Sequence, residues 1–155
     1  GVTLAYIGDG NNVAVSLALA CARLGLNFII ACPNNYSLPD EFLTRMKPQI
    51  ETGQLSVLSD PFEAVKNADV VYTDTWVSMG QEDEKKQRIN DFKEYQVNRE
   101  LMKAAGENAR VMHCLPAYRG LEITDEVIES PQSIIFDQAE NRLHFQRALL
   151  KYLLQ

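Results

Sequence analysis

Residues 74–80, Asp-Thr-Trp-Val-Ser-Met-Gly, bring together a carboxylate, an indole, a hydroxyl, a thioether and a glycine. They directly follow an apolar run at 70–73 that is typical of a buried strand. Core packing does not call for such a mixture of side chains. In an open parallel sheet, ligands bind beyond the carboxyl ends of the strands, so this stretch lies where a binding site is expected. The alternative is an ordinary turn that happens to begin with Asp. The polar run that follows, 81–88, suits a mobile surface loop or a short helix.

A glycine-rich turn, Gly-Asp-Gly-Asn-Asn at 8–12, follows the first predicted strand. A dinucleotide-binding turn would need a small residue where Val13 stands and an acidic residue at the end of the second strand, where 31–33 read Ala-Cys-Pro. A dinucleotide site is therefore disfavoured. The turn instead opens a helix, whose free N–H groups together with Asn11 and Asn12 suit a carboxylate. We expect one of the two Asn side chains to serve only as the helix cap.

The fifth predicted strand ends in His-Cys-Leu-Pro at 113–116. Pro116 removes a backbone donor and forces Leu115 out of the helical region, so that nearby carbonyl groups can point into a cleft. A catalytic pair of Cys114 with His113 is not expected, because adjacent strand residues face opposite sides. The alternative role for Cys114 is that of a small buried apolar residue.

Arg142 lies in the first turn of the predicted terminal helix, where a cation opposes the helix dipole. A negative charge that develops in a cleft would explain this placement. An ion pair with Glu140 or Asp137 is the alternative.

Strands alternate with helices along the whole sequence. We expect strands at 2–7, 28–31, 55–58, 70–73, 110–113 and 133–136, and helices over 13–24 (ended by Gly25), 37–51 (capped by Ser37), 60–67, 99–105, 125–129 and 139–154. This alternation predicts a single α/β domain, a doubly wound, Rossmann-like parallel sheet with helices on both faces. The first and fourth strands should be neighbours, which would gather the four polar segments at one carboxyl edge.

Composition narrows the classes of function. The 155 residues carry a net charge of −6, which argues against nucleic acid or an anionic membrane as a partner. Three cysteines without metal-ligand spacing predict neither a metal site nor a disulfide framework, as in a cytoplasmic protein. No apolar run is long enough for a membrane span. Because Gly1 leads straight into a strand, we expect the chain to be part of a longer protein.

Taken together, the motifs at 8–12, 74–80, 113–116 and 140–142 (Glu-Asn-Arg) resemble the second half of the ornithine carbamoyltransferase family. The likeness extends along essentially all of the chain. It implies that residues 1–155 form the ornithine-binding domain of an enzyme that makes citrulline and phosphate from ornithine and carbamoyl phosphate. It implies no cofactor and no metal. The partners it implies are a carbamoyl-phosphate-binding N-terminal domain, whose Ser-x-Arg-Thr and His-Pro-x-Gln motifs are absent here, and further copies in a homo-oligomer, a trimer in the family.

The resemblance assigns the α-groups of ornithine by motif. Asn12, with Asn11 beside it, would bind the α-carboxylate. Asp74 and Ser78 would bind the α-ammonium, to which Met79 would contribute from its backbone. Opposite charges meet in this arrangement.

The resemblance also assigns the reacting centre. Cys114 and the carbonyl of Leu115 would lie near the δ-amine, and Cys114, near Asp74, would accept its proton. Arg142 would stabilise charge on the carbamoyl oxygen. Closure of the loop at 78–80 would exclude water.

The predicted terminal helix has two apolar stripes, made of Ala139, Leu143, Leu150 and Leu154 and of Phe145, Leu149 and Leu153. One sheet face cannot cover both, so in the chain alone the second stripe would be exposed.

Three alternative functions stay open. A carbamoyltransferase for a related amine or an acylated ornithine is one, although Ser-Met-Gly at 78–80 favours free ornithine. A standalone amino-acid-binding or regulatory module is the second, and a dinucleotide-dependent oxidoreductase is the third. As one half of an enzyme, the chain is expected to be inactive by itself.

Overall fold

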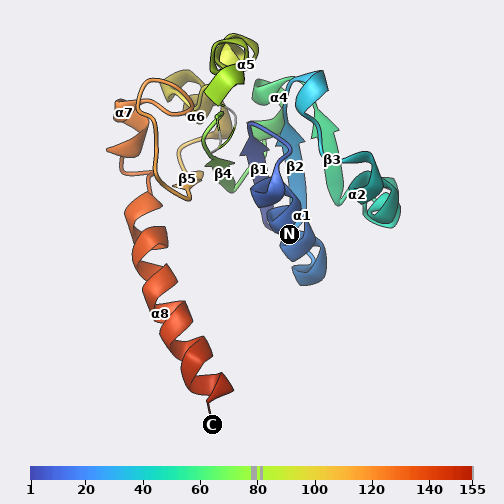
Figure 1. The fold of residues 1–155 in the computed structure, drawn as a ribbon, viewed down its shortest axis with the longest axis vertical. Coiled ribbons are helices and arrows are strands. Elements are labelled where there is room, and N and C mark those ends of the chain that lie inside the picture. Colours follow the sequence, from blue (N-terminus) through green and yellow to red (C-terminus); the bar gives the residue numbers. More distant parts are fainter. Residues whose placement is uncertain (78–79, 81, 155) are drawn as a thin grey trace.

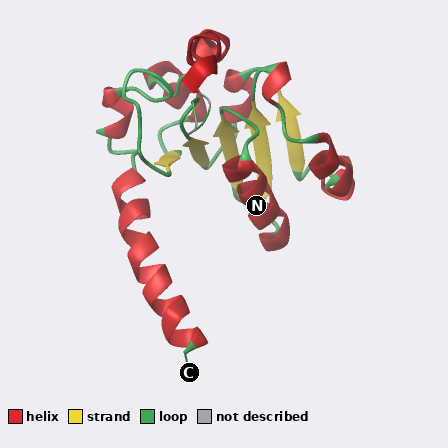
Figure 2. Cartoon of the chain, in the orientation of Figure 1, coloured by secondary structure: helices red, strands yellow, loops and turns green. Residues whose placement is uncertain are grey.

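The computed structural model describes residues 1–77, 80 and 82–154. Its centre is a five-stranded parallel sheet in the order β3-β2-β1-β4-β5 (Figures 1 and 2). The strands are β1 (Thr3–Ile7), β2 (Asn27–Ala31), β3 (Leu55–Leu58), β4 (Val70–Thr73) and β5 (Arg110–His113). At the carboxyl end of β1, Ile7 lies opposite Ala31 of β2 and Thr73 of β4. The winding therefore reverses between β1 and β4, as predicted.

Helices cover both faces of this sheet. They are α1 (Asn12–Leu24), α2 (Asp40–Arg45), α3 (Lys47–Glu51), α4 (Pro61–Val65), α5 (Lys85–Phe92), α6 (Arg99–Ala105), α7 (Asp125–Ile128) and α8 (Ile135–Leu153), with 3-10 turns η1 (Asn34–Tyr36), η2 (Glu82–Glu84) and η3 (Lys93–Tyr95). Because successive strand residues point to opposite faces, Ala5 and Ile7 pack with α4 and α6, whereas Tyr6 packs with α1 and α2. Gly25 ends α1 with a φ of 69°, in the left-handed region that favours glycine. The doubly wound α/β prediction is confirmed.

The predicted strand at 133–136 is wrong. Ser133 forms only an isolated bridge with Val111, and α8 already begins at Ile135. The apolar run that suggested a strand is short, and periodicity alone cannot separate a short buried strand from the first turn of a buried helix. Ile135 is fully buried, and it serves as the anchor of α8.

The predicted helix at 37–51 is also wrong as a single element. Its N-cap position is Pro39 rather than Ser37, and no side chain caps α2. The helix is interrupted at Met46, which ends α2 and precedes α3, and Pro48 lies in the first turn of α3. A proline cannot donate an intrahelical hydrogen bond and disfavours helical conformation in the residue before it, so one continuous helix is not possible here.

Helix α8 extends away from the sheet, and its C-terminal end lies far from the other elements (Figure 1). Within it, only Ile135 is buried. Its exposed apolar side chains include Leu143 (59%), Phe145 (67%) and Leu150 (58%), so both stripes are exposed and not only the second. A helix of this length is marginal in water without packing. None of the helices within the described residues has the length and apolar character needed to cross a membrane.

We expect the exposed face of α8 to make the isolated chain self-associate. Light scattering across a concentration series should show a mass above that of the monomer, and replacing Phe145 and Leu149 by Gln should shift it towards the monomer. Because both side chains are exposed, the free energy of unfolding should change by no more than about 0.5 kcal/mol for each substitution. Arg147→Gln, on the same helix, is the control, and a wild-type chain that stays monomeric throughout would contradict the prediction.

Candidate functional site

The turn after β1 and the end of β4 are joined by one hydrogen bond, from Asn11 Nδ2 to Asp74 Oδ2 at 2.8 Å. Asn11 Oδ1 meanwhile accepts from the backbone N–H of Val13 (2.8 Å) and of Ala14 (3.2 Å), so Asn11 is the cap of α1. The expectation that one Asn would cap the helix is confirmed, but Asn11 does not serve only as the cap, because it also binds Asp74. Asn12 is exposed at the first turn of α1 and is the Asn left to meet a ligand.

Asp74 is a buried carboxylate with one oxygen left over. Its exposed fraction is 3%, and Asp74 Oδ1 has no hydrogen-bond partner among the described residues. Burial raises the pKa of Asp74, while the hydrogen bond from Asn11 and the nearby Tyr6 hydroxyl partly oppose that rise. A buried carboxylate oxygen without a donor is costly, so this atom is suited to a cationic donor supplied by a ligand.

The turn after β5 places Cys114 and Leu115 at a hollow. Leu115 has a φ of 56°, outside the right-handed helical region as predicted, and its peptide bond to Pro116 is cis. Cys114 is exposed, so the alternative of a small buried residue is wrong. The hollow measures about 730 Å³ and is lined by residues 113–117, Gln138, Ala139 and Arg142. We call it the Cys114–Arg142 hollow.

Arg142 faces this hollow from α8. Within the described part of the chain it pairs with neither Glu140 nor Asp137, and Glu140 Oε1 lies 3.2 Å from His144 Nε2 instead. The ion-pair alternative is therefore wrong. Gln138 fixes the start of the helix, because its Oε1 accepts from the His113 N–H (3.1 Å) and its Nε2 donates to the Tyr72 hydroxyl (3.1 Å).

Sequence reasoning missed two buried groups beside these residues. His113 Nε2 lies 3.1 Å from Glu122 Oε1, and both side chains are fully buried. Burial lowers the pKa of His113, but interactions with Cys114 and Glu122 outweigh it and raise the pKa above its ordinary value. The sequence draws attention to His113 through its neighbours, whereas nothing marks Glu122 as buried.

The second missed group is Arg88 of α5, which lies in the run predicted as a surface loop or short helix. Arg88 is 3% exposed, pairs with Asp9 and donates from Nε to the carbonyl of Trp76 at 2.5 Å. Its guanidinium lies 4.7 Å from the centre of the Tyr36 ring. Burial raises the pKa of Asp9, and Arg88 opposes that rise. Arg88 thus connects the turn after β1 with the segment that begins at Asp74. The helix part of that prediction holds, but Arg88 is no surface residue.

Gly10 has a packing role in the turn. A Cβ atom at this position would lie 2.4 Å from the backbone carbon of Ser37, so only glycine fits. Gly10 is therefore explained without a bound dinucleotide.

Two of the predicted residues, Ser78 and Met79, lie outside the described residues. Five of the others are brought together in two groups, Asn11 with Asp74 and Cys114 with Leu115 and Arg142. Asn12 is exposed next to Asn11, in the first turn of α1. Within the described residues, no group of three or more His, Cys, Asp or Glu side chains could hold a metal ion.

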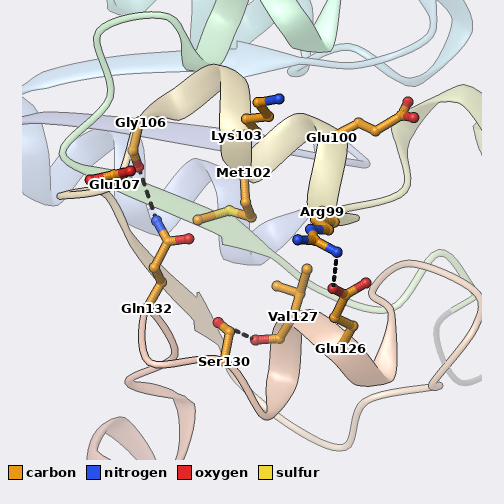
Figure 3. Close-up of a pocket in the computed structure, with 10 residues that line it drawn as sticks. All are labelled: Arg99, Glu100, Met102, Lys103, Gly106, Glu107, Glu126, Val127, Ser130 and Gln132. Carbon is orange, nitrogen blue, oxygen red and sulfur yellow. Dashed lines mark hydrogen bonds and ion pairs between the residues drawn. The ribbon is translucent and has the colours of Figure 1, made fainter.

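A second hollow, of about 720 Å³, lies between α6 and α7 (Figure 3). Some of its polar groups already have partners within the protein. Gln132 Nε2 donates to the carbonyls of Gly106 and Ala109, each at 2.9 Å, and Arg99 lies 3.1 Å from Glu126. It contains none of the predicted site residues.

Comparison with known proteins identifies the family of the chain. Residues 1–153 match the family model described as "Aspartate/ornithine carbamoyltransferase, Asp/Orn binding domain". The chain belongs to the aspartate/ornithine carbamoyltransferase family. It is 54% identical over 151 residues to the ornithine carbamoyltransferase of Caldicellulosiruptor saccharolyticus, covering 96% of this chain and 49% of that one.

Solved structures of this family show the same fold. The ornithine carbamoyltransferase of Pyrococcus furiosus matches with a TM-score of 0.88 and 48% identity, over 97% of this chain and 49% of its own. The anabolic ornithine carbamoyltransferase of Campylobacter jejuni matches with a TM-score of 0.90 and 42% identity, over 98% of this chain and 51% of its own. The chain thus spans about half the length of the carbamoyltransferases that it matches.

We expect Arg88→Met to lower the free energy of unfolding by about 3–5 kcal/mol, because it leaves the Asp9 carboxylate buried without its partner. Urea unfolding measures this change. Adding Asp9→Asn should restore part of it, and Lys85→Met, an exposed substitution in the same helix, should have little effect. A loss below about 1 kcal/mol would mean that the pair does not hold these segments together.

Proposed function

We propose that residues 1–155 are the ornithine-binding domain of an ornithine carbamoyltransferase. The whole enzyme would transfer the carbamoyl group of carbamoyl phosphate to the side-chain amine of ornithine, giving citrulline and phosphate. The observation that carries the proposal is the oxygen Oδ1 of buried Asp74, which has no hydrogen-bond partner among the described residues. Membership of a carbamoyltransferase family supports it, as do relatives that bear this enzyme's name.

Ornithine would be held first by its α-groups. Its α-carboxylate would lie at the amino terminus of α1, where the positive end of the helix dipole and the amide of Asn12, with the cap Asn11 beside it, favour an anion. Its α-ammonium would donate to Asp74 Oδ1, which no donor of residues 1–77, 80 or 82–154 reaches. Ser78 would bind the ammonium from the other side, and Met79 would contribute a backbone group. The roles of these last two residues stay predictions.

The side chain of ornithine would then extend to the Cys114–Arg142 hollow. There the δ-nitrogen attacks the carbamoyl carbon, the C=O electrons move onto oxygen, and Arg142 stabilises the resulting negative charge. The C=O bond re-forms as the C–O bond to phosphate breaks, and phosphate leaves with its electron pair. Cys114, as a thiolate, accepts the proton that the amine loses and becomes a thiol, and the carbonyl of Leu115 orients the amine by accepting its hydrogen bond.

The exposed helix α8 indicates that this chain binds another protein domain. Helix α8 exposes two apolar stripes that no other element among the described residues covers. The carbamoyl-phosphate-binding domain, which would supply the other substrate, would pack against them. We further infer a homo-oligomer of the whole enzyme, a trimer as the resemblance implies, and a cytoplasmic location, which free Cys21, Cys32 and Cys114 fit.

Citrulline formation from ornithine and carbamoyl phosphate tests this proposal. We expect no product from the chain alone and steady turnover when it is mixed with a carbamoyl-phosphate-binding half. Arg142→Ala should lower kcat by about a hundredfold or more, as loss of one stabilising donor does elsewhere. Arg147→Ala removes the same charge from the same helix and should leave kcat unchanged. Ornithine binding without turnover in the mixture would instead favour the standalone amino-acid-binding module, and turnover with a related amine only would favour the alternative carbamoyltransferase.

A further inference from the structure

The turn that carries Cys114 and Leu115 is hydrogen-bonded to the buried side chain of His113. Its Nδ1 accepts the backbone N–H of Leu115 at 2.8 Å, two residues further on. An atom that accepts this bond carries no hydrogen, so in this arrangement the ring is neutral and its hydrogen is on Nε2, which donates to Glu122 Oε1 at 3.1 Å. Both nitrogens of the ring are therefore used in holding neighbours. Because the pKa of His113 is raised, a second proton binds more readily, and on Nδ1 it would break the bond to Leu115.

Glu122 connects the two ends of the same turn. Its Oε1 accepts the hydrogen bond from His113 and also the backbone N–H of Tyr118, at 2.6 Å. Glu122 is itself anchored, because its carbonyl accepts from the Val97 N–H at 2.8 Å. The two ends of the segment 113–118 are thus both hydrogen-bonded to the same oxygen, Glu122 Oε1.

The conformation of Leu115 needs such support. A φ of 56° is unfavourable for a bulky residue other than glycine, and a backbone of this kind persists only where its surroundings hold it. The hydrogen bond from the Leu115 N–H to His113 acts on this residue directly. Because Cys114 and Leu115 both line the hollow with Arg142, the backbone conformation of Leu115 also affects where its carbonyl and the Cys114 side chain lie in that hollow.

Stability alone does not explain a buried His–Glu pair. Apolar residues of similar volume commonly stabilise a core as well as or better than a buried polar or ionic pair. Glu122 Oε2 moreover has no partner among the described residues, which is a further cost. What the pair provides is the fixed geometry of the turn, and misplacement by about 1 Å at a reacting centre can cost about a hundredfold in rate.

We propose that His113 and Glu122 are positioning residues for carbamoyl transfer, which hold the turn at 113–118 so that Cys114 and the Leu115 carbonyl meet the δ-amine. The inference rests on the proposed function. Neither residue touches the substrate. Both act through the backbone of the turn, so they affect the step in which the amine reacts rather than the binding of the α-groups of ornithine.

The test compares paired variants in the chain mixed with a carbamoyl-phosphate-binding half. Glu122→Leu removes the oxygen that accepts both bonds and should lower kcat by about tenfold to a hundredfold, while the ornithine KM changes by less than about threefold. Glu122→Gln keeps an oxygen for both bonds and should retain kcat within about threefold of wild type. His113→Asn keeps an acceptor near Leu115 and should retain more activity than His113→Leu. Glu126→Leu, an exposed glutamate on α7, is the matched control.

The outcomes separate this inference from the proposed function. A wild-type mixture that makes no citrulline would remove both. With an active wild type, the inference fails if folded Glu122→Leu keeps its kcat, or if Glu122→Gln loses as much as Glu122→Leu. It also fails if Glu122→Gln moves the pH profile of kcat/KM by about one unit, because His113 would then transfer protons with Cys114. Glu122→Gln decides the question even if the leucine variants do not fold.

Discussion

The hydrogen bond between Asn11 and Asp74 is the contact on which the site depends. It joins the turn after β1 to the end of β4, the two strands between which the winding of the sheet reverses. One amide caps α1 and binds the carboxylate at the same time, so the amino terminus of the helix and the buried charge are held at a fixed separation. An amino acid requires this pairing, because its own carboxylate and ammonium are separated by a single carbon.

Burial of the Asp74 carboxylate costs free energy on folding, and it also favours the binding of an ammonium group. Desolvation raises the pKa of Asp74, and in the part of the chain that the structure describes Asp74 Oδ1 has no donor. An ammonium group would replace the hydrogen bonds to water that this oxygen loses on folding. Arg88 and Gln138 provide the rigidity that the arrangement needs. Arg88 connects Asp9 with the carbonyl of Trp76, and Gln138 connects β4 with β5 and the start of α8. The Cys114–Arg142 hollow is thereby fixed relative to Asp74.

The sequence predicts the alternating elements because local apolar runs and helix breaks specify them, and parallel connections leave few sheet orders. It fails at Ile135, where a short apolar run is a helix start, and near Pro48, where one helix becomes two. It cannot reveal Arg88 or Glu122, since a charged side chain in a polar stretch becomes a buried partner only through distant contacts. The sequence also cannot show that Asn11 caps α1 and binds Asp74 while Asn12 stays exposed, because this depends on the position of Asp74.

The measurement that tests this account most directly is the affinity of the wild-type chain and of Asp74→Asn for ornithine, by calorimetry. Losing a charge-assisted bond should weaken binding by about tenfold to a hundredfold. Wild-type affinity should also fall with decreasing pH, because protonation of Asp74 removes the charge, and this fall should begin above the usual carboxyl pKa of 3.8. Asp40→Asn, an exposed acid at the start of α2, is the control. Equal affinity of wild type and Asp74→Asn at neutral pH would contradict the account.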